Sequence, residues 1–246
     1  PFNWPEPGFE TRFWSVGPGG IGYGDNDDAT VIGNVTSLYM RTDFTIIDTS
    51  DISWAILHVD YDDAFVAYLN GHELARANIG TPGTRPLYNQ TALVDHEAQM
   101  YSGGMPDRFI IHKDTVRKYL TYGVNTLALQ VHNKSAASSD LTSIAYFSVG
   151  LKTPGQTYRQ VPAWFNDPVT EKTNLPLLII NTFNQEIPDE PKIKASLRVV
   201  DNGPGKMNGF LDDATGYEGP IGIEIRGQSS QQFPKKGYGV ELWTTA

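Results

Sequence analysis

The chain has 246 residues, with 28 acidic against 19 basic side chains, a net charge of −9 and no cysteine. Without cysteine there are no disulfides and no thiolate metal sites, and the acidic balance argues against a nucleic-acid partner, because phosphate binding needs a basic face. No apolar run approaches the ~18 residues that a membrane span needs, and the 24 Gly, 16 Pro and 12 Tyr favour strands and turns over helices.

The first part of the chain is predicted to form short strands with one short helix. The Asn70-Gly71 pair between two apolar segments indicates a hairpin turn, since both positions tolerate positive φ. Leu127, Leu129 and Val131 alternate with polar or small residues, as in a strand with one face on a core. This pattern predicts an antiparallel β-sandwich. Its strands are expected at 37–47, 54–60, 65–69, 72–77, 109–112, 125–132 and 144–151, and the helix at 115–120.

The sandwich is expected to occupy residues 1–151. Residues 152–174 are rich in Pro and polar side chains and are predicted to form a linker, with Trp164-Phe165 docked on one neighbour. Residues 175–246 are predicted to form a short, incomplete antiparallel sheet, with strands at 175–182, 192–201, 221–226 and 238–243.

Two stretches of the sandwich resemble a known fold family. They are Asp60-Tyr-Asp-Asp-Ala-Phe-Val-Ala-Tyr-Leu-Asn-Gly71 and Gly123-Val-Asn-Thr-Leu-Ala-Leu-Gln-Val-His-Asn133. Together they are similar to the galactose-binding-domain-like jelly roll, which occurs in carbohydrate-binding modules. The resemblance covers roughly residues 9–151. It implies a jelly-roll sandwich with a glycan as the expected partner.

A second resemblance lies near the C-terminus. The run Arg226-Gly-Gln-Ser229-Ser230-Gln-Gln-Phe-Pro-Lys-Lys236-Gly-Tyr resembles the opening segment of the spore-coat CotH kinase-like family. The resemblance implies that Arg226 or Lys236 faces nucleotide phosphates, with Ser229 and Ser230 as hydrogen-bonding partners, and that Mg-ATP binds in the full-length protein. The family's catalytic acids come later in its sequence. The chain is therefore expected to be an N-terminal fragment that is inactive alone.

An acidic loop is the candidate metal site. Asp25, Asp27 and Asp28 follow a flexible glycine, and carboxylates on an irregular loop are the ligands that Ca²⁺ prefers. Jelly rolls of the family that the sandwich resembles often carry a structural calcium ion. The spacing departs from the EF-hand pattern, and a solvated turn held by Asx hydrogen bonds is the alternative. A second acidic group, at positions 60, 62 and 63, could flank a ligand or bind a metal together with a distant loop. It is interpreted as mainly structural, accepting backbone N–H bonds.

The loop 78–106 is the candidate ligand site, because a loop of this length in a compact domain is either functional or packed on itself. It carries Tyr88, His96 and Tyr101, the mixture of aromatic and polar groups that a sugar site uses. The alternative is an Ω-loop held by its own aromatic side chains.

Two functions remain open. The first is a non-catalytic β-sandwich, binding carbohydrate or acting as a structural spacer, in a secreted or cell-surface CotH-like protein. The second is an accessory part of an atypical kinase or phosphotransferase, whose catalytic residues lie beyond this chain.

Overall fold

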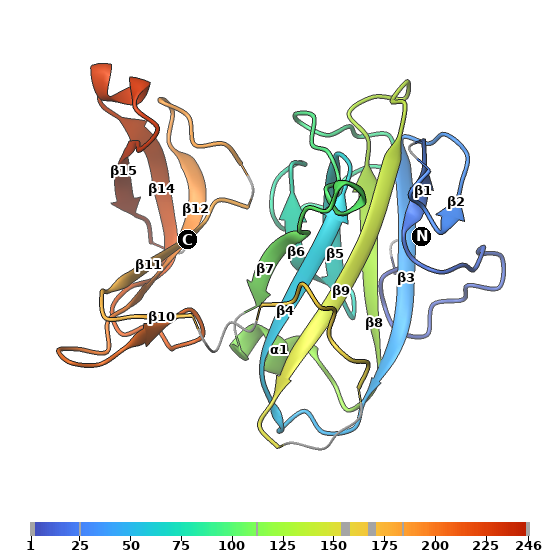
Figure 1. Cartoon of the computed structure of the whole chain (residues 1–246), viewed down its shortest axis with the longest axis horizontal. Coiled ribbons are helices and arrows are strands. Elements are labelled where there is room, and N and C mark those ends of the chain that lie inside the picture. The colour runs from blue at the N-terminus through green and yellow to red at the C-terminus, as the bar shows by residue number, and fades with distance from the viewer. Residues whose placement is uncertain are drawn as a thin grey trace. The chain divides into compact units, whose positions relative to one another are not determined.

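The computed structural model describes residues 3–24, 26–111, 113–153, 158–166, 171–183 and 185–244. The chain divides into two compact units, residues 1–164 and 165–246 (Figure 1). The predicted linker limits, 152 and 174, stay a prediction.

The first unit is a sandwich of two sheets (Figure 1). One sheet has the strand order β2-β1-β9-β4-β7 and the other β3-β8-β5-β6. All pairs are antiparallel except the short β1–β2 pair. The predicted antiparallel sandwich is confirmed. Its elements are β1 (Ile21–Tyr23), β2 (Thr30–Val31), β3 (Ser37–Ile46), β4 (Ile52–Tyr61), β5 (Ala64–Leu69), β6 (His72–Ala77), the 3-10 turn η1 (Met100–Ser102), β7 (Asp107–Ile111), α1 (Lys113–Tyr119), β8 (Gly123–His132) and β9 (Leu141–Leu151).

The core between the sheets follows from the alternation in sequence. Leu127, Leu129 and Val131 of β8 all enter it, because successive side chains of a strand point to opposite faces. The predicted hairpin joins β5 to β6, and Asn70 and Gly71 have φ values of 51° and 85°. A β-branched side chain would be strained at either turn position.

The outer face of the four-stranded sheet is also covered. Trp4, from the N-terminal segment, packs edge-on against Tyr39 and Tyr68, with ring centroids 5.0 and 5.8 Å away. Ile79 and Ala92, from the loop after β6, join the same cluster. Strand β5 is therefore buried on both faces, which its alternating pattern did not predict.

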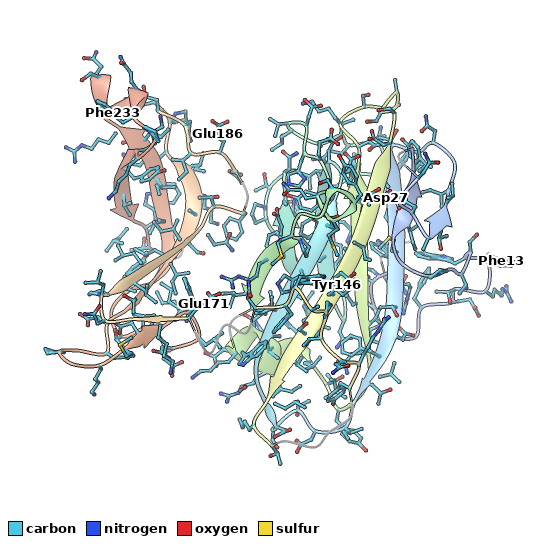
Figure 2. All side chains as sticks on the ribbon, viewed as in Figure 1. Phe13, Asp27, Tyr146, Glu171, Glu186 and Phe233 are labelled. Carbon is cyan, nitrogen blue, oxygen red and sulfur yellow. The ribbon has the colours of Figure 1, made fainter. Side chains whose placement is uncertain are left out.

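Trp164, the last residue of the first unit, packs on the outer face of the five-stranded sheet. Trp164 packs edge-on against His58 of β4 and Tyr146 of β9, at 5.0 and 5.1 Å between ring centroids. Burial lowers the pKa of His58 to about 4, so this imidazole is neutral at pH 7. Tyr146 is labelled on the sheet in Figure 2.

The second unit contains a four-stranded antiparallel sheet in the order β11-β12-β14-β15, as predicted. Ala195, Leu197, Ile221 and Ile223 make its small core. No helix among the described residues is long and apolar enough to cross a membrane. The elements are β10 (Lys172–Thr173), β11 (Leu177–Asn181), β12 (Ile193–Val200), β13 (Asn208–Gly209), β14 (Glu218–Arg226), the 3-10 turn η3 (Ser229–Gln232) and β15 (Gly237–Leu242).

Candidate functional site

The long loop after β6 is anchored by polar side chains of the sheet beneath it. Gln130 donates its amide N–H groups to the Pro86 carbonyl, at 3.1 Å, and to the Tyr39 hydroxyl, at 3.0 Å. His132 lies 2.7 Å from the Gln90 carbonyl through Nδ1. Gln130 and His132 are fully buried, so the bonds that hold the loop are shielded from water.

An aromatic pocket lies where this loop meets the N-terminal segment. It has a volume of about 470 Å³. Trp4 and Trp14 stack in its wall with ring centroids 6.2 Å apart. Trp4 is buried, whereas Trp14 is half-buried and Tyr88 is 71% exposed, so the outer rings can meet a ligand. The aromatic pocket is lined by Trp4, Trp14, Tyr39, Arg85, Pro86, Leu87 and Tyr88.

The hydroxyl groups near the pocket stay protonated at neutral pH. Burial raises the pKa of Tyr68 to about 12. Burial also raises the pKa of Tyr39, although a hydrogen bond with Ser37 and the charge of Arg85 act in the opposite direction. Arg85 lies over the Tyr68 ring, 5.1 Å from its centroid. The pocket thus combines apolar rings with hydroxyl donors and one cation.

The three predicted ligand residues lie in different surroundings. Tyr88 lines the aromatic pocket, which includes neither His96 nor Tyr101. The His96 ring stacks flat on Tyr61 at 4.0 Å, and its Nδ1 lies 3.0 Å from the Tyr61 carbonyl. Tyr101 is 56% exposed in η1. Sequence reasoning missed Trp4 and Trp14, although these two tryptophans lie in an N-terminal run that is rich in aromatic residues and could have signalled an aromatic surface.

His96 belongs to a charged environment of its own. Burial disfavours its imidazolium, but the carboxylate of Asp107 and the carbonyl of Tyr61 outweigh this, so the pKa of His96 is raised. Its Nε2 is 3.6 Å from Asp107, to which the Tyr61 hydroxyl also donates at 3.2 Å. This arrangement stabilises a protonated ring beside the acidic end of β4.

Asp60 and Asp63, at the end of β4, accept hydrogen bonds from backbone N–H groups, as the sequence indicated. Asp60 accepts the N–H groups of Gln99 and Met100, at 2.8 and 2.9 Å. Asp63 accepts those of His96 and Lys134, at 2.8 and 2.6 Å. The structural interpretation is confirmed for both residues, which tie two loops to the sandwich.

The side chain of Asp62, the residue between them in sequence, lies in a different environment. Its carboxylate and those of Glu97 and Asp140 offer oxygen atoms within 4.8 Å of one another, and we call these three residues the acidic corner. Burial raises the pKa of Asp62 to about 8, and the charges of Asp63, Asp140 and Glu97 add to the effect. Three carboxylates at this separation repel one another, and a divalent cation would relieve that repulsion.

The predicted metal loop lies beside the acidic corner. Asp25 lies outside the described residues. Asp27 accepts a 3.4 Å hydrogen bond from Thr142, near the start of β9 (Figure 2). Gly24 lies so close to Asp140 that a Cβ atom at position 24 would be 2.5 Å from the Asp140 Cβ. Asp28 lies against Gly22 in the same way. The tertiary structure thus brings Asp62, which the sequence placed in the second acidic group, together with Glu97 and Asp140 beside this loop.

The predicted nucleotide residues gather in the turn between β14 and β15. Arg226 ends β14 and is exposed, and Ser229 and Ser230 open η3. Lys236 is half-buried and donates to the carbonyl of Gln231. The four residues are therefore close along one turn, with Lys236 already bonded to its own loop.

No protein-family model and no curated protein matches the sequence. Similar solved structures include an α-L-rhamnosidase of Streptomyces avermitilis complexed with L-rhamnose, at 19% identity and a TM-score of 0.33, over 49% of this chain and 9% of that one. A calcium-binding mutant of Bacteroides uniformis β-glucuronidase 2 is similar at 13% identity and a TM-score of 0.32, over 98% of this chain and 26% of that one. The matched regions are thus a minor part of both enzymes.

Asp62→Asn is expected to stabilise the metal-free protein increasingly as pH rises. The native carboxyl has a pKa of about 8, against an ordinary value of 3.8, so between these values the native state holds a proton that the unfolded state has released. Stability from this group is therefore lost as pH rises through that window. The difference in unfolding free energy between the variant and wild type should grow by at least ~1 kcal/mol, measured by urea unfolding with chelator present.

Asp95→Asn is the matched control, because the Asp95 side chain is 80% exposed. Its difference from wild type should change less over the same pH range than that of Asp62→Asn. Parallel pH profiles for wild type and Asp62→Asn would contradict the raised pKa.

Proposed function

We propose that the first unit is a non-catalytic carbohydrate-binding module and that the aromatic pocket is its sugar site. The observation that carries the proposal is a pocket with aromatic walls on a loop that buried side chains hold in place. Sugar rings present C–H faces that pack on aromatic side chains, while hydroxyl groups need a few fixed polar partners. Trp14 and Tyr88 supply the aromatic surfaces, and Tyr39 and Arg85 supply the polar partners.

Rigidity of the pocket supports this function. Ser37 donates to the Tyr88 carbonyl at 2.6 Å, in addition to the bonds from Gln130 and His132 that hold the same loop. A loop already ordered in the free protein does not lose conformational entropy when a ligand binds. Such a site suits a weakly binding, flexible glycan.

We also propose that Ca²⁺ binds at the acidic corner as a structural ion. Asp62, Glu97 and Asp140 would supply the carboxylate oxygens, and Asp27, which accepts a hydrogen bond from Thr142, would add a further oxygen ligand. Burial raises the pKa of Asp62, and the neighbouring negative charges of Asp63, Asp140 and Glu97 raise it further. A bound cation would connect the ends of β4 and β9 with two loops.

An alternative is that the chain is an accessory part of a CotH-like phosphotransferase that is secreted or displayed at the cell surface. The grouping of Arg226, Ser229, Ser230 and Lys236 in one turn supports it. These residues could contact phosphates through two cations and two hydroxyl groups.

Tyr88→Ala should weaken glycan binding at least tenfold, because it removes an exposed ring from the pocket wall. Tyr122→Ala is the matched control, since Tyr122 is 78% exposed and is not among the lining residues. The measurement is a glycan array on the full chain, followed by calorimetry with the strongest hit. Equal loss in both variants, or no glycan bound by the wild type, would overturn the proposal.

Calcium should raise the melting temperature of the wild type by several degrees, because an ion that binds only the native state stabilises it by about 2.7 kcal/mol at a hundredfold excess over Kd. Asp62→Asn should abolish the rise, whereas Asp95→Asn should keep it. Superimposable melting curves of the wild type in calcium and in chelator would rule out the ion.

If the chain is part of a CotH-like phosphotransferase, we expect it to bind Mg-ATP weakly. Lys236→Ala should lose this binding, and Lys194→Ala should retain it. Lys194 is an exposed lysine of β12 in the same unit. Calorimetry measures the binding, and incubation with labelled ATP should show no phosphoryl transfer. Transfer that Lys236→Ala removes would contradict the expectation that the chain is inactive alone, and identical binding by both variants would exclude this turn as the site.

A further inference from the structure

The aromatic pocket carries a positive charge in a protein that is strongly acidic. The chain has a net charge of −9, yet Arg85 is the charged side chain among the residues that line the pocket. The described lining residues include no Asp or Glu, so Arg85 gives the pocket wall a positive charge.

Arg85 is held by bonds to both of its neighbours in the chain. Arg76 donates to the carbonyl of Thr84 at 2.8 Å, and Gln130 donates to the carbonyl of Pro86 at 3.1 Å. Arg76 and Gln130 are both buried. The ring of Pro86 also restricts the backbone directly after Arg85. The fold therefore fixes the backbone from which this side chain enters the pocket.

The guanidinium group is positioned by the ring of Tyr68, which packs on Trp4 of the pocket wall. It lies 5.1 Å above the centre of the Tyr68 ring, whose electron-rich face attracts a cation. Arg85 is half-buried, and a charge that is partly removed from water acts more strongly on a ligand than an exposed one. A guanidinium keeps its charge at any physiological pH and presents a planar set of donors.

This charge decides which ligands suit the aromatic walls. Rings alone would accept a neutral sugar or an ammonium group. A fixed guanidinium repels ammonium ligands and pairs with a carboxylate through two parallel hydrogen bonds. A hexuronate unit combines both requirements, since it has a C–H face for the rings and a carboxylate at its edge.

We propose that the aromatic pocket selects an acidic glycan by binding a hexuronate residue, with Arg85 as the specificity-determining residue. The proposal rests on the glycan-binding function proposed above and adds the chemical class of the ligand. The remaining lining residues would serve neutral and acidic sugars alike, so selectivity depends on the one cation.

The test compares each acidic oligosaccharide with its methyl ester, which keeps the sugar ring and removes the charge. The full chain is titrated calorimetrically with galacturonate and glucuronate tetramers and with their methyl esters. We expect at least one acidic tetramer to bind about tenfold more tightly than its ester, with the preference shrinking in high salt.

Arg85→Gln should bring the acidic tetramer to the affinity of the ester while leaving the ester's affinity unchanged. Arg117→Gln is the control for loss of one positive charge, because Arg117 lies on α1 with a 53% exposed side chain, and it should retain the preference. Melting temperatures of both variants check that they are folded.

The possible failures are distinguishable. Equal affinity for the acid and the ester overturns the hexuronate assignment and leaves carbohydrate binding in place. A preference for the acid that survives in Arg85→Gln overturns the role of Arg85. Binding of neither form overturns this inference, and the glycan array with Tyr88→Ala decides the proposed function separately.

Discussion

The arrangement of the first unit depends on a row of buried polar side chains on the outer face of β8. Gln130, His132 and the adjoining Asn133 are fully buried, and an unsatisfied polar group there would cost roughly 1–3 kcal/mol. One nitrogen of each side chain bonds to loop or edge backbone: Gln130 to Pro86, His132 to Gln90 and Asn133 to Val35. Among the described residues, Gln130 Oε1, His132 Nε2 and Asn133 Oδ1 are buried without a hydrogen-bond partner, so these bonds are made at the cost of three unsatisfied acceptors. Burial lowers the pKa of His132 to about 4, so the ring is neutral at pH 7 and donates from Nδ1. These bonds give the long loop one conformation, and the aromatic pocket exists because of it.

The acidic end of β4 shows how one residue type takes opposite roles through local geometry. Asp60 and Asp63 each meet two backbone N–H groups, which stabilise a carboxylate. Asp62 instead faces the carboxylates of Glu97 and Asp140. The same cluster therefore contains two anchors of the fold and one group at which negative charge is unfavourable. This excess of negative charge beside Asp62 is the basis of the proposed Ca²⁺ site.

Much of the fold was predictable because its determinants are local. The strands β3 to β9 and the sheet β11-β12-β14-β15 follow from alternation, short spacing and turn residues, and the Asn70-Gly71 hairpin follows from tolerance of positive φ. The roles of Asp60 and Asp63 were also inferred correctly. The sequence did not predict that the outer faces of both sheets are covered. The contact of Trp4 with Tyr39 and Tyr68, for example, joins segments that are more than 30 residues apart.

The sequence by itself determined the antiparallel β class, the hairpin, the acidic character and the chemical types available at each loop. Only the tertiary structure decided which of these groups meet. It placed Tyr88 with Trp4, Trp14 and Arg85, gave His96 a separate environment, and brought Asp140 to Asp62 and Glu97. The physical reason is that strand formation depends on periods of a few residues, whereas a site depends on which loops the packed sheets bring together, and that is fixed by burial and hydrogen bonding across the whole unit.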